Sequence, residues 1–152
     1  MRVVSLLPSA TEILCVVGGE DLLVGRSHEC DVPRSVADRP VLTAARTTGS
    51  SSQDIDREVR AMLESEDDPN PSLYHLDVDR LVGLAPDVIL TQDLCDVCSI
   101  DLETVRGAVA HLDPRPEIVS LDPTTVWEML DDLLRVGRAV GLESEEIGRA
   151  HV

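Results

Sequence analysis

The sequence contains no lysine and no phenylalanine, and it has only one tryptophan and one tyrosine. A hydrophobic core must therefore be built from aliphatic side chains. All 13 basic residues are arginines and face 29 acidic residues, which gives a net charge of −16. Such a surface repels the phosphates of nucleic acids and anionic lipids. We interpret the acidity first as solvation, with docking onto a basic partner as the alternative.

Long apolar runs are also missing. No segment approaches the roughly 18 to 20 apolar residues of a membrane span. The apolar residues 3–7 are too few for a signal peptide and end at Pro8. As written, the chain is expected in the cytoplasm, or in the periplasm or outside the cell only if an upstream signal is missing. The four cysteines are then better explained as thiols or metal ligands than as structural disulfides.

The sequence has neither a glycine-rich phosphate loop nor a Gly-x-Ser-x-Gly nucleophile elbow. Gly18 and Gly19 follow an expected helix instead of preceding one, so they cannot bind a phosphate at a helix start. We therefore expect a protein that is not an enzyme.

Apolar runs that are typical of buried strands alternate with helical patterns along the chain. This alternation predicts an α/β domain with a parallel, Rossmann-like sheet. Ser9 and Glu12 have the spacing of a capping box for the first helix. Residues 43–51 are polar and are expected to form a loop, and Trp127 is expected in the core, with a ligand platform as the alternative. The expected strands are 3–6, 23–25, 88–91 and 118–121.

Ligands of open parallel sheets bind at the carboxyl ends of the strands. Three expected loops lie there, at residues 8–11, 27–31 and 92–99, and they contain most of the chemically notable side chains. The ligand-binding candidates are Pro8, Ser9, Ala10, Ser27, His28, Glu29, Asp31, Gln92 and Asp93.

The same loops also contain one histidine and three cysteines that could converge. His28, Cys30, Cys95 and Cys98 provide imidazole and thiolate groups, which suit a zinc- or cobalt-type ion in a tetrahedral site. Three alternatives stay open: a redox pair of Cys95 and Cys98, an iron–sulfur cluster, and residues that only line a cleft.

Four motifs together resemble one known family. They are Leu-Pro-Ser-Ala-Thr-Glu (7–12), Ser-His-Glu-Cys-Asp (27–31), Leu-Ala-Pro-Asp-Val-Ile (84–89) and Gln-Asp-Leu-Cys-Asp-Val-Cys (92–98). The first and third are similar to motifs of the periplasmic proteins of ABC importers that bind iron-siderophores and cobalamin. The second and fourth, which contain the cysteines, are absent from typical importer members and resemble the loops of cobalamin-binding members without a signal. The resemblance runs from Arg2 to about Glu146.

The resemblance implies a two-lobed protein whose lobes are joined by one long helix, with this chain as the amino-terminal lobe. It implies a cobalamin-like (corrinoid) or iron-siderophore chelate between the lobes, in contact with residues 8–10 and 27–31. Asp79 resembles the acidic residue that docks onto the permease. Half of the cleft would belong to the missing carboxyl-terminal lobe. A cytoplasmic metal- or corrinoid-handling protein with a His/Cys site is the alternative.

The chain is accordingly divided into three segments. Residues 1–122 are expected to form the ligand-binding lobe. Residues 123–146 are expected to form a capping helix and the start of the connecting helix. The last six residues, 147–152, read like a translated sequencing adapter, so we expect a non-native tail there.

Overall fold

The structure is a computed structural model, and it describes residues 1–49, 51–63, 73–93, 100 and 102–142. Four parallel strands form its central sheet in the order β2-β1-β5-β6, and two antiparallel strands form a second, small sheet. The parallel α/β architecture predicted from the sequence is thereby confirmed. The central strands are β1 (Val3–Ser5), β2 (Leu23–Arg26), β5 (Val88–Thr91) and β6 (Glu117–Ser120).

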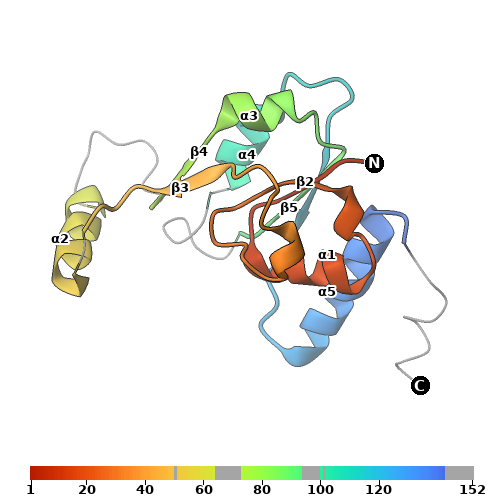
Figure 1. Cartoon of the computed structure of the whole chain (residues 1–152), viewed down its shortest axis with the longest axis horizontal. Helices are drawn as coiled ribbons and strands as arrows, with labels where there is room; N and C mark the ends of the chain where they lie inside the picture. Colours follow the sequence, from red (N-terminus) through yellow and green to blue (C-terminus); the bar gives the residue numbers. More distant parts are fainter. Residues whose placement is uncertain (50, 64–72, 94–99, 101, 143–152) are drawn as a thin grey trace.

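Helices cover both faces of the central sheet (Figure 1). Successive residues of a strand point to opposite faces, and Val3 and Val4 of β1 accordingly belong to two separate hydrophobic clusters. One face packs against α1 and α5, and the other carries α3, α4 and the small sheet. These helices are α1 (Pro8–Val16), α3 (Val78–Gly83), α4 (Leu102–Val109) and α5 (Val126–Ala139).

The first helix does not begin as the sequence pattern predicted. It starts at Pro8, its N-cap residue is Leu7, and no side chain caps it. Proline suits the first helical position because its missing N–H has no partner there in any case. The expected capping box of Ser9 and Glu12 is therefore wrong. The helix ends before Gly18, whose φ of 84° favours glycine.

The polar stretch after residue 42 is only partly the loop that was expected. Its first residues form β3 (Thr43–Ala45), which pairs with β4 (Tyr74–Leu76) in an antiparallel ladder. Residues that precede β3 lie beside β2, where Val41 forms an isolated bridge with Arg26. This small sheet therefore brings residues from two distant segments close to the end of β2. The helix α2 (Ser52–Leu63) follows β3 and lies to one side of the body in Figure 1.

Trp127 was expected in the core, but its side chain is 74% exposed in the first turn of α5. This helix turns Asp132 and Val136 toward the interior instead. No helix among the described residues is both long and apolar enough to cross a membrane.

The strand order contains a topological switch point. From β1 the chain moves to β2 on one side, and it later returns to β5 on the other side. The connection that follows β1 and the connection that follows β5 therefore separate at the carboxyl edge of the sheet. In open parallel sheets, this kind of separation creates the crevice in which ligands bind.

Candidate functional site

A pocket of about 250 Å³ lies at this switch point. Residues that follow β1, β2 and β5 all reach it, together with one residue from each strand of the small sheet. Four of the nine predicted ligand-binding residues line it, namely Pro8, Ser27, Glu29 and Gln92. The complete lining is Leu6, Leu7, Pro8, Ser27, Glu29, Thr43, Tyr74, Gln92 and Ile100.

A buried threonine holds the loop after β2 in place. The Thr43 hydroxyl lies 2.9 Å from Ser27 Oγ, accepts a hydrogen bond of 3.0 Å from the His28 backbone N–H, and lies 2.6 Å from His28 Nδ1. Because these contacts involve both the backbone and the ring, they fix the loop and the orientation of the imidazole together. Thr43 is buried, so water does not compete for these bonds.

The His28 ring is satisfied on only one of its two nitrogens. Its other nitrogen, Nε2, is buried and has no hydrogen-bond partner, although Glu29 Oε1 lies 3.2 Å away. At that distance the two groups attract each other if the ring is protonated, but their geometry makes no hydrogen bond. The ring also packs against Tyr74, with 5.1 Å between the ring centroids. An oriented imidazole with a spare nitrogen therefore lies beside the pocket, in contact with its lining residues Thr43 and Tyr74, although His28 itself does not line it.

Cys30, a predicted metal ligand, does not line the pocket. Its thiol is fully buried, and Thr11 Oγ1 donates a hydrogen bond of 3.1 Å to its Sγ. Burial raises the pKa of the Cys30 thiol, with smaller opposing effects from its bonds to Thr11 and Ser27. The thiol is consequently protonated at neutral pH. Cys15, on α1, is half-buried and packs against one of the two hydrophobic clusters.

The predicted metal set is only partly visible. Cys95 and Cys98 lie outside the described residues, so the convergence of all four side chains stays a prediction. Within the described part of the chain, no group of three or more His, Cys, Asp or Glu side chains is arranged to hold a metal ion.

The remaining predicted residues differ in their exposure to solvent. Ser9, Asp31 and Asp93 are exposed, but Ala10 is fully buried in the core, so its side chain does not face a ligand. Asp79, the residue predicted to dock onto a permease, is exposed in the first turn of α3.

Sequence reasoning missed five pocket residues: Leu6, Leu7, Thr43, Tyr74 and Ile100. Thr43 and Tyr74 come from the two strands of the small sheet, whose three-residue lengths give almost no periodic signal. Only the isolated aromatic at position 74, in a chain nearly free of aromatics, marked that segment as unusual.

Comparison with known proteins places the chain in a fold class. No family model and no curated protein matches the sequence. Among solved structures, the periplasmic heme-binding protein HutB of Vibrio cholerae matches 99% of this chain at 16% identity, with a TM-score of 0.63. The periplasmic vitamin B12-binding protein BtuF of the same species matches 98% at 18% identity, with a TM-score of 0.61.

An ABC transporter substrate-binding protein from Listeria monocytogenes matches 97% of the chain at 22% identity, with a TM-score of 0.58. The chain spans 43% to 44% of the length of these three proteins. At such low sequence identity, the structural similarity shows that the fold is shared and nothing more. The chain has the α/β fold of one lobe of periplasmic binding proteins, as the resemblance of its motifs implied.

Proposed function

We propose that this chain is part of a substrate-binding component that binds a metal chelate for an ABC transporter. The observation that carries the proposal is the pocket at the switch point, which lies in a fold shared with proteins that bind heme and vitamin B12. The chelate is of the cobalamin, heme or iron-siderophore kind. The chain contributes one wall of the site, and a second lobe would contribute the other.

The chemistry of the pocket suits such a ligand. Leu6, Leu7 and Ile100 offer apolar surface to the face of a macrocycle. Glu29 and Gln92 offer polar groups to the amides or carboxylates at its rim. An apolar wall with a few convergent polar groups is the usual composition of small-molecule sites.

Location and partners follow from the same proposal. The matched heme and vitamin B12 proteins are periplasmic, so they favour the periplasmic alternative and give no support to a cytoplasmic location. The matched structures are binding proteins, which favours a role other than catalysis. Asp79, exposed on α3, would contact the permease.

Titration with cyanocobalamin, followed by two-dimensional NMR, tests the proposal. We expect the backbone signals of Ser27, Tyr74 and Gln92 to shift on binding. Replacing Gln92 with alanine should weaken binding about 2- to 10-fold, the effect of one lost hydrogen bond.

The matched control is Gln53→Ala on α2, because Gln53 is exposed and none of the residues that line the pocket belongs to α2. Its affinity should equal that of the parent. Shifts that are confined to other surfaces, or no shifts with cyanocobalamin, hemin or a ferric siderophore, would contradict the proposal.

A second candidate function is favoured by the unpartnered Nε2 of His28. Metal-bound histidines commonly use their second nitrogen for a hydrogen bond that orients the ring, and Thr43 makes this contact with Nδ1 at 2.6 Å. In this alternative, His28, Cys30, Cys95 and Cys98 bind a zinc- or cobalt-type ion. The metal would have to displace the thiol proton of Cys30 to solvent, and the side chain would have to turn out of the interior.

Cobalt titration under reducing conditions tests this alternative. We expect a thiolate-to-cobalt absorption band in the parent and its loss when Cys30 and Cys95 are both replaced with serine. Cys15→Ser is the control and should keep the band. If the parent shows no band, or the double variant keeps it, these residues only line or support the pocket.

A further inference from the structure

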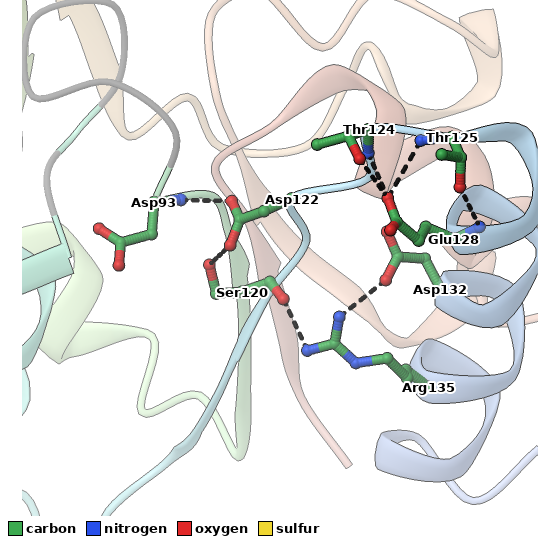
Figure 2. A network of polar contacts seen from close by, with 8 residues as sticks. All are labelled: Asp93, Ser120, Asp122, Thr124, Thr125, Glu128, Asp132 and Arg135. Carbon is green, nitrogen blue, oxygen red and sulfur yellow. Dashed lines mark hydrogen bonds and ion pairs between the residues drawn. The ribbon is translucent and has the colours of Figure 1, made fainter.

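An acidic side chain beyond the pocket is hydrogen-bonded to the loop that follows β5. The Asp93 backbone N–H donates a hydrogen bond of 2.7 Å to Asp122 Oδ1, and the Ser120 hydroxyl donates one of 2.9 Å to Asp122 Oδ2 (Figure 2). Asp122 comes just after β6, so one carboxylate joins the carboxyl ends of two neighbouring strands.

This carboxylate adds one hydrogen bond beyond the last backbone bond between β5 and β6. The last backbone bond between the two strands runs from the Leu121 N–H to the Thr91 carbonyl at 2.9 Å. Beyond it the strands separate, and the Asp93 N–H binds the Asp122 side chain in place of a strand carbonyl. A carboxylate is a stronger acceptor for such an N–H than a neutral group.

The carboxylate is itself attached to a helix. Ser120, which donates to Asp122, accepts a hydrogen bond of 2.7 Å at its carbonyl from Arg135 of α5. Arg135 in turn forms an ion pair of 2.8 Å with Asp132, whose side chain is almost completely buried. Figure 2 shows this continuous row of contacts from α5 through Asp122 to Asp93. The position of Asp122 is therefore fixed by the body of the lobe.

We propose that Asp122 is a positioning residue of the chelate site. It fixes the backbone at Asp93 and thereby holds the preceding residue, Gln92, in the pocket wall. This inference rests on the proposed function, because it takes the pocket as the chelate site. The Asp122 carboxylate makes the wall of that site rigid where the loop after β5 begins. Without the carboxylate, the ligand has to order this segment on binding, and that ordering reduces the affinity.

The test uses three variants of the full chain, with cyanocobalamin as the probe. Asp122→Ala removes the acceptor and should weaken binding about 3- to 10-fold. Asp122→Asn retains an oxygen for the Asp93 N–H and should restore most of the affinity. Asp131→Ala removes an equal charge from an exposed neighbour on α5, and it should bind as the parent does.

Amide hydrogen exchange at Asp93 is the second measurement. It should be faster in Asp122→Ala than in the parent and unchanged in Asp131→Ala. If Asp122→Ala binds as tightly as the parent, or if Asp131→Ala weakens binding equally, the positioning role is wrong while the proposed function stands. If the parent binds none of the chelates, the proposed function fails and the positioning role fails with it, whatever the exchange at Asp93 shows.

Discussion

Several polar contacts of the loop after β2 converge on Thr43, and its one hydroxyl proton limits how they can be arranged. If the hydroxyl donates to His28 Nδ1, then Nε2 carries the ring proton and faces Glu29. If instead Nδ1 carries the proton, the hydroxyl donates to Ser27 Oγ, and Nε2 presents a lone pair. Both arrangements satisfy the contacts of Thr43. A metal ion on Nε2 needs the lone pair of that nitrogen and would therefore select the second tautomer.

A second set of buried hydroxyls, those of Ser5 and Thr11, also holds the loop after β2. Thr11 Oγ1 lies 2.8 Å from Ser5 Oγ and 3.1 Å from Cys30 Sγ, and all three side chains are fully buried. Buried polar groups are tolerated when they are hydrogen-bonded to one another. The cluster therefore fixes the end of β1, the first turn of α1 and the loop after β2 relative to one another.

At the scale of elements, α5 has the most complete helix start in the described chain. The Thr125 hydroxyl accepts a hydrogen bond from the Glu128 N–H, and the Glu128 carboxylate accepts from the Thr125 N–H, which is a capping box (Figure 2). The bonds that Glu128 accepts, from Thr124 first and then Thr125, lower the pKa of its carboxyl group. These hydrogen bonds therefore stabilise the folded state fully above the ordinary glutamate pKa. Their contribution is lost as the pH falls through the lowered pKa of Glu128.

Replacing Thr125 with alanine should destabilise the lobe by about 1 kcal/mol, because the N–H of Glu128 loses its acceptor at the helix start. Chemical denaturation of the parent and the variant at neutral pH measures this difference. Thr47→Ala is the control, since Thr47 is in a loop and caps no helix. A variant as stable as the parent would show that the capping box contributes nothing to stability.

For the whole molecule, the central sheet was predictable because its two inner strands, β1 and β5, are mainly apolar runs that are buried along their whole length. The predicted strands 3–6, 23–25, 88–91 and 118–121 agree with the observed ones to within a residue at either end. The carboxyl-edge pocket followed from the same topology.

The rest of the site depends on long-range packing that local sequence does not encode. Thr43 reaches the pocket only because β3 pairs with β4, about 30 residues farther along the chain. Trp127 is exposed because the inward face of α5 is formed by Asp132, Val136 and Gly137. Asp132 can occupy that face because it forms an ion pair with Arg135, a pairing that hydrophobic periodicity cannot reveal.

The size of the pocket limits how tightly this chain alone can bind a chelate. Its volume of about 250 Å³ lies below the roughly 300 to 1,000 Å³ of sites that enclose drug-sized ligands. The chain also spans only 44% of the matched vitamin B12-binding protein. A corrinoid on this wall would lose its rigid-body freedom while most of its surface stayed in water.

We therefore expect a dissociation constant for cyanocobalamin in the millimolar range at best, which corresponds to a binding free energy of about −4 kcal/mol. Calorimetry at high protein concentration, or the NMR titration described above, measures it. Asp79→Ala is a useful control, because a residue that contacts only a permease should leave this constant unchanged. A nanomolar constant for the 152-residue chain would show that a single lobe forms the entire site, and the proposal of a shared cleft would then be wrong.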